Sequence, residues 1–341
     1  MSAEHTAWTI WEGRPEDSHA LRELFQECFG YDRGEHHDQW KFADNPAGAP
    51  AFMVAEDAGR IVGSNLQWPT PIRIGAEVIL GAQSIDTMTH PDYRGQGMFA
   101  RLGKATFGCA ADRGVELLVA FPNSQSYHGA VRTVGWEPIG DAPMYLRPLR
   151  PSLHPRVPSW AGPGIDRAAR LIPRGGKRGI ETRVAQPAGA ELASLWQAAD
   201  RDRSGCRVDK DAAYFDWRFD ARAGRQYRWV CAYRNGALSA AAVWGVDNHS
   251  GQATLAQLVG TDDNAMRAAL AQVVNQALAS GCAAMSAIGR DDHLNGILRR
   301  SGFFRHGSFP IVVKQLTART FPVDIRNSAS WTFFGADLDT M

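Results

Sequence analysis

Residues 87–99 read Thr-Met-Thr-His-Pro-Asp-Tyr-Arg-Gly-Gln-Gly-Met-Phe, which predicts a strand, a tight loop and the start of a helix. Residues 83–89 include several β-branched side chains, which favour a strand. Pro91 cannot donate a hydrogen bond to a sheet, so we expect the strand to end there. Gly95 and Gly97 have no Cβ, and they therefore allow another molecule to approach the backbone closely.

An amphipathic helix is expected directly after this loop. The apolar side chains of its predicted buried face are Met98, Leu102, Ala105 and Cys109. Gly114 suits the left-handed position that ends a helix. The first amides of a helix have no partner within it and lie at the positive end of its dipole. Since Arg94 stands beside them, we predict a phosphate-binding site at this helix N-terminus.

Composition and charge narrow the class of protein. The chain has 341 residues, 44% hydrophobic and 21% charged, which fits a globular protein of two domains. A net charge of +1 gives no overall field for nucleic acid, although a local basic groove is compatible with it. We find no run of about 18 apolar residues and no signal-peptide pattern. Five scattered cysteines without a CxxC pair suit reduced thiols. We therefore expect a cytoplasmic protein with no metal, nucleic acid or membrane partner.

Residues 148–180 separate two similar halves. Proline and glycine recur in this segment, which we interpret as a linker. Residues 1–147 and 181–341 share one predicted order of strands and helices. Gly114 and Gly135 are 21 residues apart, as are Gly281 and Gly302, and an aromatic residue follows the second glycine each time. This self-similarity indicates two copies of one α/β unit.

The expected elements follow from hydrophobic periodicity and turn residues. In the first half we expect strands at 8–11, 51–55, 60–63, 72–74, 77–86, 115–121 and 136–146, and helices at 15–30, 98–113 and 124–134. In the second half we expect strands at 181–184, 228–233, 239–246, 254–259, 282–288 and 308–315, and helices at 189–199, 211–219, 265–280 and 293–300. Residues 31–46 are polar and aromatic and could wall a substrate site.

The order strand, RGQGMF at 94–99, helix, strand, helix and Gly135-Trp136 resembles the GNAT superfamily of acyl-CoA-dependent N-acetyltransferases. The family signature is [Q/R]-x-x-G-x-[G/A]. Arg94 and Gly97 match it, whereas Phe99 stands where glycine or alanine is usual. The resemblance covers residues 8–146, and residues 181–316 by layout only. It implies an α/β (α+β) fold with two GNAT-like domains, each a mixed, mostly antiparallel sheet flanked by helices.

The resemblance also implies acetyl-CoA as co-substrate. The positions that would hold the pyrophosphate are Arg94, Gly95, Gln96, Gly97, Met98 and Phe99. Met88 and Thr89 would bond the pantetheine arm through their backbones, and Asn123 matches a cofactor-contacting asparagine of the family. The corresponding loop of the second half, residues 260–264, is acidic and lacks the arginine. Because its carboxylates would repel pyrophosphate, we expect this degenerate copy to shape the acceptor site or stabilise the fold instead.

Two residues are candidates for the chemistry of acyl transfer. Many members of the family use a tyrosine as the acid at the position of Val131, and Tyr127 lies one helical turn earlier. Tyr127 is therefore a candidate acid, with a packing role as the alternative. Asp86 lies within a predicted strand, where a carboxylate is unfavourable unless it is paired or functional. We predict that Asp86 is the base or binds the amine, with backbone bonding as the alternative.

These expectations favour an N-acetyltransferase in which a small-molecule amine attacks acetyl-CoA directly in a ternary complex. A non-catalytic acyl-CoA-binding or regulatory protein is the alternative, because the usual tyrosine is missing. A transferase that uses aminoacyl-tRNA is a third hypothesis, and the near-neutral charge and the intact loop argue against it. Residues 331–339 form an aromatic and then acidic tail, which could be an edge strand or could offer Asp337 or Asp339 to a cationic acceptor. The oligomeric state is left open.

Overall fold

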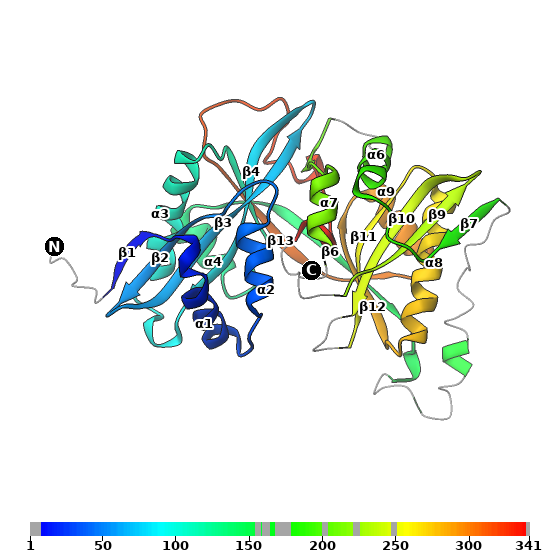
Figure 1. Cartoon of the computed structure of the whole chain (residues 1–341), viewed down its shortest axis with the longest axis horizontal. Helices are drawn as coiled ribbons and strands as arrows, with labels where there is room; N and C mark the ends of the chain where they lie inside the picture. Colours follow the sequence, from blue (N-terminus) through cyan, green and yellow to red (C-terminus); the bar gives the residue numbers. More distant parts are fainter. Residues whose placement is uncertain are drawn as a thin grey trace.

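The two halves of the chain form two lobes that share one β-sheet (Figure 1). The computed structural model describes residues 8–153, 158, 164–167, 179–199, 204–220, 226–246 and 251–338. Most of the expected linker, and Asp339 of the tail, lie outside these residues. The predicted α/β class is confirmed, since helices pack on a mixed sheet in which most neighbouring strands are antiparallel.

The first half follows the predicted order of elements. Its strands are β1 (Thr9–Glu12), β2 (Ala51–Asp57), β3 (Arg60–Ile74), β4 (Glu77–Thr89), β5 (Leu117–Ala120) and β6 (Glu137–Pro148). Its helices are α1 (Ser18–Phe29), α2 (Glu35–Asp38), α3 (Met98–Asp112) and α4 (Tyr127–Gly129), with π-helical turns η2 (Gln39–Ala43) and η4 (Ala130–Val134) and a 3-10 turn η3 (Pro91–Tyr93). The two short strands expected at 60–63 and 72–74 are one long strand, β3.

The second half repeats this order with two short additions. Its strands are β7 (Ile180–Arg183), β8 (Cys206–Val208), β9 (Arg228–Arg234), β10 (Ala237–Val246), β11 (Ala253–Gly260), β12 (Ala284–Arg290), β13 (Phe304–Gln315) and β14 (Trp331–Phe334). Its helices are α6 (Gly189–Ala199), α7 (Ala212–Arg218), α8 (Asp263–Ala279) and α9 (Asp292–Arg300), and a 3-10 turn η9 (Gly335–Asp337) follows β14. The additions are β8 and β14.

Strand β6 of the first half and strand β13 of the second each lie next to strands of the other half. The sheet runs β1-β2-β3-β4-β5-β13-β6-β12-β11-β10-β9-β7. Strand β13 therefore pairs with β5, and β6 pairs with β12. Strands β13 and β6 lie between the two lobes (Figure 1). Since β13 takes the place in the second half that β6 takes in the first, the two copies have exchanged these strands. Two separate sheets were expected, whereas the described strands form one continuous sheet.

Strands β8 and β14 close part of this sheet into a ring. Strand β14 pairs with β12 and β8, and β8 pairs with the far end of β3. The ring runs β3-β4-β5-β13-β6-β12-β14-β8, and each of its strands contributes to one buried cluster. Trp331 and Phe333 of the tail stack in this cluster with ring centroids 5.1 Å apart. The tail is thus an interior strand, and Asp337 is buried 2.6 Å from Lys210.

Two tryptophans join η2 of the first half to α7 of the second. The Trp40 Nε1–H donates to the Trp217 carbonyl at 2.7 Å, and the Trp217 Nε1–H donates to the Trp40 carbonyl at 3.0 Å. Their rings stack with centroids 5.2 Å apart, and Trp68 of β3 packs edge-on against both. Buried indole N–H and carbonyl groups need hydrogen-bond partners, so these two bonds hold η2 against α7. Segment η2 carries Lys41, one of the charged residues described below.

Candidate active site

The loop before α3 has the backbone geometry that its sequence predicts. Gly95 and Gly97 have φ angles of 79° and 74°, a conformation that favours glycine. Gly97 is the N-cap of α3, and no side chain caps the helix. The first helical bond runs from the Arg101 amide to the Gly97 carbonyl at 3.2 Å, so the amides of residues 98–100 precede any intrahelical acceptor. This exposed helix N-terminus suits an anion.

Contacts with Trp8, with Asp57 of β2 and with Gly63 of β3 hold the loop and the start of α3 in place. The Trp8 Nε1–H donates to Gln96 Oε1 at 3.2 Å, and the Tyr93 hydroxyl donates to Asp57 Oδ2 at 2.6 Å. Met98 is buried, and its side chain occupies the space that a Cβ at Gly63 would need. A glycine in β3 therefore allows the start of α3 to approach the sheet closely.

Strand β4 contains a β-bulge at Asp86 and Thr87. Leu66 pairs with Ile85 and Ser64 pairs with Met88, so Asn65 faces both Asp86 and Thr87. Asp86 has a φ of 43°, which is rare for a residue other than glycine. The Ser64 hydroxyl donates to the Asp86 carbonyl at 2.9 Å and the Asn65 amide donates to Thr87 Oγ1 at 2.8 Å. These bonds stabilise the bulge.

Beyond the bulge, β4 and β5 separate. Strand β5 pairs with residues 81–83 of β4, whereas Met88 and Thr89 pair only with β3 in the described sheet. The side of β4 that faces β5 is therefore open at Met88 and Thr89. The Cys28 thiol donates to the Thr89 carbonyl at 3.6 Å, and burial raises the pKa of this thiol. An open strand edge of this kind can pair with an extended ligand.

A large cavity fills the space between the separated strands. Its volume is about 960 Å³, and it runs from the loop at Arg94, past Thr89, to α1 and η2. The second half contributes Val246 of β10 and Phe309 and Val312 of β13 to its wall. The exchanged strand therefore forms part of the cavity of the first half.

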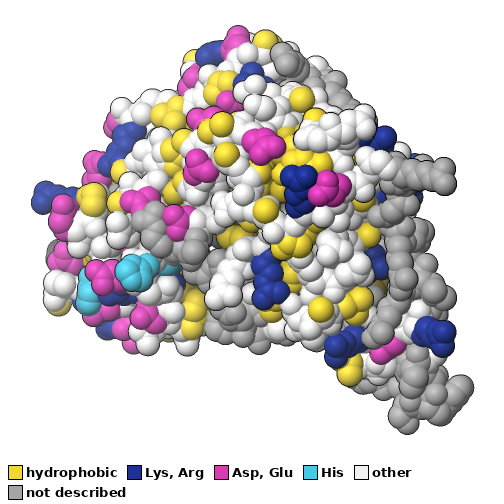
Figure 2. Space-filling view, turned by 45° about the vertical axis from the view of Figure 1, so that its right-hand side comes forward, with side chains coloured by type: hydrophobic (Ala, Val, Ile, Leu, Met, Phe, Trp, Pro, Cys, Tyr) yellow, Lys and Arg dark blue, Asp and Glu magenta, His cyan; other side chains and the backbone are white. Residues whose placement is uncertain are grey.

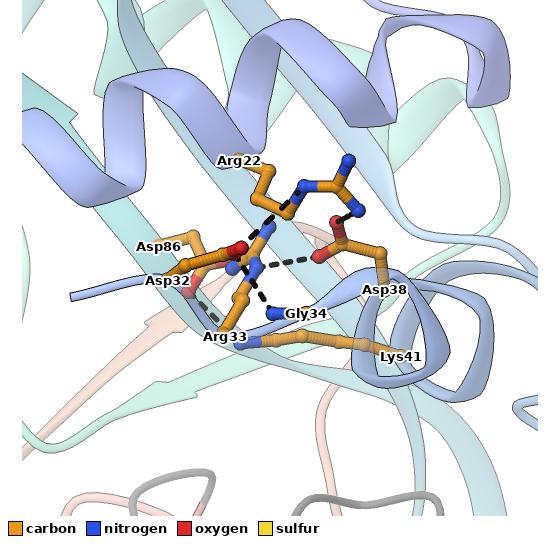
Figure 3. Close-up of polar contacts among 7 residues, drawn as sticks. All are labelled: Arg22, Asp32, Arg33, Gly34, Asp38, Lys41 and Asp86. Atoms are coloured by element: carbon orange, nitrogen blue, oxygen red, sulfur yellow. Dashed lines mark hydrogen bonds and ion pairs between the residues drawn. The ribbon is translucent and has the colours of Figure 1, made fainter.

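Asp86 lies at the centre of a buried charge cluster at one end of the cavity (Figure 3). Its Oδ2 accepts from Arg33 Nη1 at 2.5 Å, and its Oδ1 accepts from Lys41 Nζ at 2.9 Å. Arg33 Nε also donates to Asp38 at 2.5 Å, and Arg22 lies 3.7 Å from the other oxygen of Asp38. The side chains of Arg33, Lys41 and Asp86 are only 4%, 6% and 5% exposed.

Burial and the neighbouring charges together set the pKa values of Asp86, Asp38 and Arg33. Burial alone would raise the pKa of Asp86, but the charges of Lys41 and Arg33 outweigh it and hold the pKa well below its usual range. For Asp38 burial prevails over Arg33, and its pKa is raised. Burial opposes the charge of Arg33, yet the two carboxylates raise its pKa. Asp86 is therefore an ionised carboxylate and a weak proton acceptor.

The structure brings most of the predicted site residues to one cavity. Its lining includes Asp86, Met88, Thr89, Arg94, Phe99 and Asn123. Gly95, Gln96 and Gly97 lie in the exposed loop beside it. Asn123 Oδ1 accepts from the amides of Gln125 and Ser126, both at 3.0 Å, which shapes the turn after β5.

Tyr127 lies apart from this lining. Its ring is half-buried against the core beside α3 and contacts His128 at 5.8 Å between centroids. Ser126, Gln125 and Tyr31 border the cavity instead. The role of Tyr127 as the acid stays a prediction.

Sequence reasoning missed the two cations that hold Asp86. Arg33 and Lys41 both fall in the segment 31–46, which was predicted only as a possible wall. A carboxylate in the middle of a strand does signal that a partner must exist, because an unpaired buried charge is unfavourable. No local pattern identifies the partner, since Arg33 and Lys41 lie 53 and 45 residues before Asp86.

The corresponding helix N-terminus of the second half is already capped. Asp262 Oδ1 accepts from the amides of Asn264 at 2.7 Å and Ala265 at 3.2 Å. Its other oxygen lies 2.6 Å from Arg234, and Asp263 pairs with His293 at 2.8 Å. In α8 a side-chain carboxylate thus occupies the place that is open at Gly97 of α3. The two helix N-termini therefore differ, since the first amides of α3 have no side-chain cap and those of α8 do.

Comparisons with known proteins agree with this geometry. Residues 9–139 match the family model described as an acetyltransferase (GNAT) domain. These residues form a GNAT acetyltransferase domain. No curated protein sequence matches the chain.

Solved structures share the fold over almost the whole chain. A conserved protein of unknown function from Enterococcus faecalis V583, described as a probable N-acyltransferase, has a TM-score of 0.67 at 13% identity, covering 91% of this chain and 73% of that one. A GCN5-related N-acetyltransferase from Anabaena variabilis gives 0.64 at 13% identity, with 91% and 73% covered. A tandem GNAT protein from the clavulanic acid biosynthesis pathway gives 0.60 at 14% identity, with 92% and 100% covered. The tandem arrangement predicted from the repeat therefore has a structural counterpart.

Other kinds of site receive no support from the described residues. Among them, no group of three or more histidine, cysteine and acidic side chains is placed to hold a metal ion. On the face drawn in Figure 2, basic and acidic side chains are interspersed, with no continuous basic stripe. No helix within the described ranges has the length and apolar character needed to cross a membrane.

Proposed function

We propose that this protein is an acetyl-CoA-dependent N-acetyltransferase that acts on a small-molecule amine by direct attack in a ternary complex. The observation that carries the proposal is the open edge of β4 at Met88 and Thr89, which leads through one cavity to the glycine N-terminus of α3. The membership of residues 9–139 in the GNAT acetyltransferase family supports acyl transfer in general.

The GNAT domain offers a separate group for each part of acetyl-CoA. The amide-bearing pantetheine arm would pair with the backbone of Met88 and Thr89 as an added strand does. The pyrophosphate would lie at the N-terminus of α3, where amides and the helix dipole favour an anion and Arg94 adds a positive charge. Asn123 lines the cavity after β5 and would contact the arm from that side. Bound acetyl-CoA would supply the activated thioester.

Asp86 and Tyr127 remain the proposed residues for the chemistry. Because the pKa of Asp86 is lowered and both of its oxygens are bonded, its environment favours binding or orienting the amine over removing a proton. For the acid, Tyr127→Phe should be compared with Tyr31→Phe and Ser126→Ala. The variant that loses the alkaline limb of the pH–rate profile identifies the proton donor.

The second copy would complete the cavity of the first copy and would bind no cofactor of its own. Its helix N-terminus is capped by Asp262, and its strand β13 lines the cavity of the GNAT domain. The five cysteines, none of them in a disulfide, are compatible with our proposal of a cytoplasmic protein.

Calorimetry with acetyl-CoA and thiol release with a panel of amines would test the proposed function. We expect one acetyl-CoA per chain and release of free CoA with at least one amine. Binding without turnover on any amine would favour an acyl-CoA-binding or regulatory protein. Two observations favour that alternative: both oxygens of Asp86 are already bonded, and Tyr127 lies outside the cavity lining. Failure to bind CoA at all would refute both.

A further inference from the structure

Aromatic rings at the end of α1 form an exposed apolar wall on the cavity. Phe29 is 51% exposed and Tyr31 is 44% exposed, and both line the cavity together with Phe25. The ring centroid of Phe25 lies 4.6 Å from that of Phe29 and 5.1 Å from that of Tyr31. Exposed aromatic side chains in mutual contact are unfavourable in water, and such clusters mark binding surfaces.

A neighbouring charge packs against Phe25, the ring that both Phe29 and Tyr31 contact. The Arg33 guanidinium lies 4.7 Å from the centroid of the Phe25 ring and 5.3 Å from that of Phe42. Asp86 and Asp38 in turn fix the guanidinium at 2.5 Å each. Helix α1 ends at Gly30 in the left-handed conformation, which directs the chain from Phe29 to Tyr31. A wall that is already ordered loses little conformational entropy when a ligand binds.

The two carboxylates beside this wall, Asp86 and Asp32, are already bonded within the protein. Both oxygens of Asp86 are bonded within the protein. Asp32 at the rim accepts from the Gly34 amide at 2.9 Å. A hydroxylated acceptor needs many matched polar partners when it is buried, whereas a flat apolar body needs only contact area.

We propose that the acceptor is a primary amine with a flat apolar body, an aryl or arylalkyl amine, which packs against Phe29 and Tyr31. Its amine extends from these rings into the cavity, which Asp86 and Thr89 also line. In the reaction the amine nitrogen forms a bond to the acetyl carbonyl carbon and the carbon–sulfur bond breaks. The amine loses one proton and the CoA thiolate gains one. This inference rests on the proposed function and names its substrate class.

The first experiment measures kcat/KM for 2-phenylethylamine, ethanolamine and glucosamine with acetyl-CoA saturating. We expect 2-phenylethylamine to be preferred by at least about tenfold. Phe29→Ala and Tyr31→Ala should each raise its KM by about tenfold and leave the KM for acetyl-CoA unchanged. The matched control is Phe304→Ala, because Phe304 is 47% exposed on β13 and does not line the cavity.

The second experiment measures binding of 2-phenylethylamine to the full chain with CoA present, by calorimetry, and does not depend on turnover. We expect binding to the wild type and to Phe304→Ala, and about tenfold weaker binding to Phe29→Ala. Equal affinity of Phe29→Ala and wild type, or a preference for glucosamine, overturns the inference while the proposed function stands. Aryl amine binding without thiol release from any amine overturns the proposed function, and the wall is then a ligand site without transfer.

Discussion

Asp86 combines two features that are unfavourable by themselves. Its φ of 43° belongs to a region that non-glycine residues rarely occupy, and its carboxylate is buried. Arg33 and Lys41 compensate for the burial, and the Ser64 hydroxyl bonds the carbonyl of the strained residue. Strain and buried charge at one position, next to the open edge of β4, are typical of a functional site.

Asp86→Asn should destabilise the protein at neutral pH. The substitution leaves Arg33 and Lys41 buried without their carboxylate, and loss of one partner of a buried pair costs about 3–5 kcal/mol of unfolding free energy. The folded pKa of Asp86 is lowered, so its contribution is present above the unfolded value of about 4 and is lost as the pH falls toward the folded value. Urea unfolding at several pH values should show the difference from wild type narrowing in acid.

Asp209→Asn is the control for this measurement. Asp209 also pairs with an arginine, Arg73, at 2.8 Å, but the two side chains are 26% and 27% exposed. A partly exposed pair contributes only about 0–1 kcal/mol, so this variant should stay close to wild type. Equal losses in Asp209→Asn and Asp86→Asn would contradict the special role of burial at Asp86.

At the level of elements, the start of α3 is the part that the sequence predicts best. Glycines at 95 and 97 and the apolar face of residues 98–109 are local signals, and the structure has the expected loop and helix. The bulge at Asp86 and the π-helical turn η4 are not visible locally. In η4 the Gly135 amide bonds the Ala130 carbonyl, five residues back, whereas a regular helix was predicted over residues 124–134. The argument that placed Tyr127 beside Val131 assumed that regular helix.

Gly97→Glu should abolish acetyl-CoA binding. The new carboxylate stands at the N-terminus of α3, where it would compete with the pyrophosphate for the same amides and repel it. We expect the dissociation constant measured by calorimetry to rise by about a hundredfold or more. Because a residue with a Cβ at positive φ is strained, stability should also fall by about 1–2 kcal/mol.

Gly114→Glu separates these two effects. Gly114 lies just beyond the other end of the same helix with a φ of 81°, and a Cβ added there would meet no atom within 4 Å, as at Gly97. The Gly114→Glu variant should therefore lose a similar amount of stability but bind acetyl-CoA with wild-type affinity. If Gly97→Glu binds acetyl-CoA as tightly as the wild type, or if both variants lose the same affinity, the assignment of the cofactor site to the start of α3 is wrong.

For the whole molecule, the repeat was readable from the sequence but the exchange of strands was not. The spacing of Gly114 and Gly135 matches that of Gly281 and Gly302, which indicates two copies. Each copy ends in an equivalent strand, β6 or β13, and either strand carries the pattern that suits a place beside β5 or β12. Local sequence therefore specifies the strand but not its partner, as in domain swapping. The three-residue strand β8 was not predicted, and β14 was expected only as an edge strand, not as part of a closed ring.

Trp217→Phe tests whether the second half positions the acceptor end of the cavity. The substitution removes the bond to the Trp40 carbonyl and leaves that buried acceptor unpaired, at a cost of about 1–3 kcal/mol. Since η2 carries Lys41, we expect the acceptor KM to rise severalfold while the acetyl-CoA KM stays the same. In the control Trp244→Phe, a buried indole loses its bond to Gln276 within the second half. It should lose similar stability without any change in acceptor KM, and an equal change in both would argue against positioning through Trp217.

The exchanged strands predict that the two halves cannot be separated into working domains. The test compares the intact chain with a chain cut, after folding, at a protease site inserted within the expected linker, residues 148–180. We expect the fragments to elute together in native gel filtration and to bind acetyl-CoA, because β13 pairs with both β5 and β6 and the ring of strands buries one shared core. Residues 1–150 expressed alone lack β13, β8 and β14, which exposes the edge of β5 and the apolar side chains of the ring. This fragment should be insoluble, or should show the circular dichroism of an unfolded chain. A soluble, cooperatively folding fragment that binds acetyl-CoA would instead show that β6 can return to β5 and that the exchange is not required for the fold.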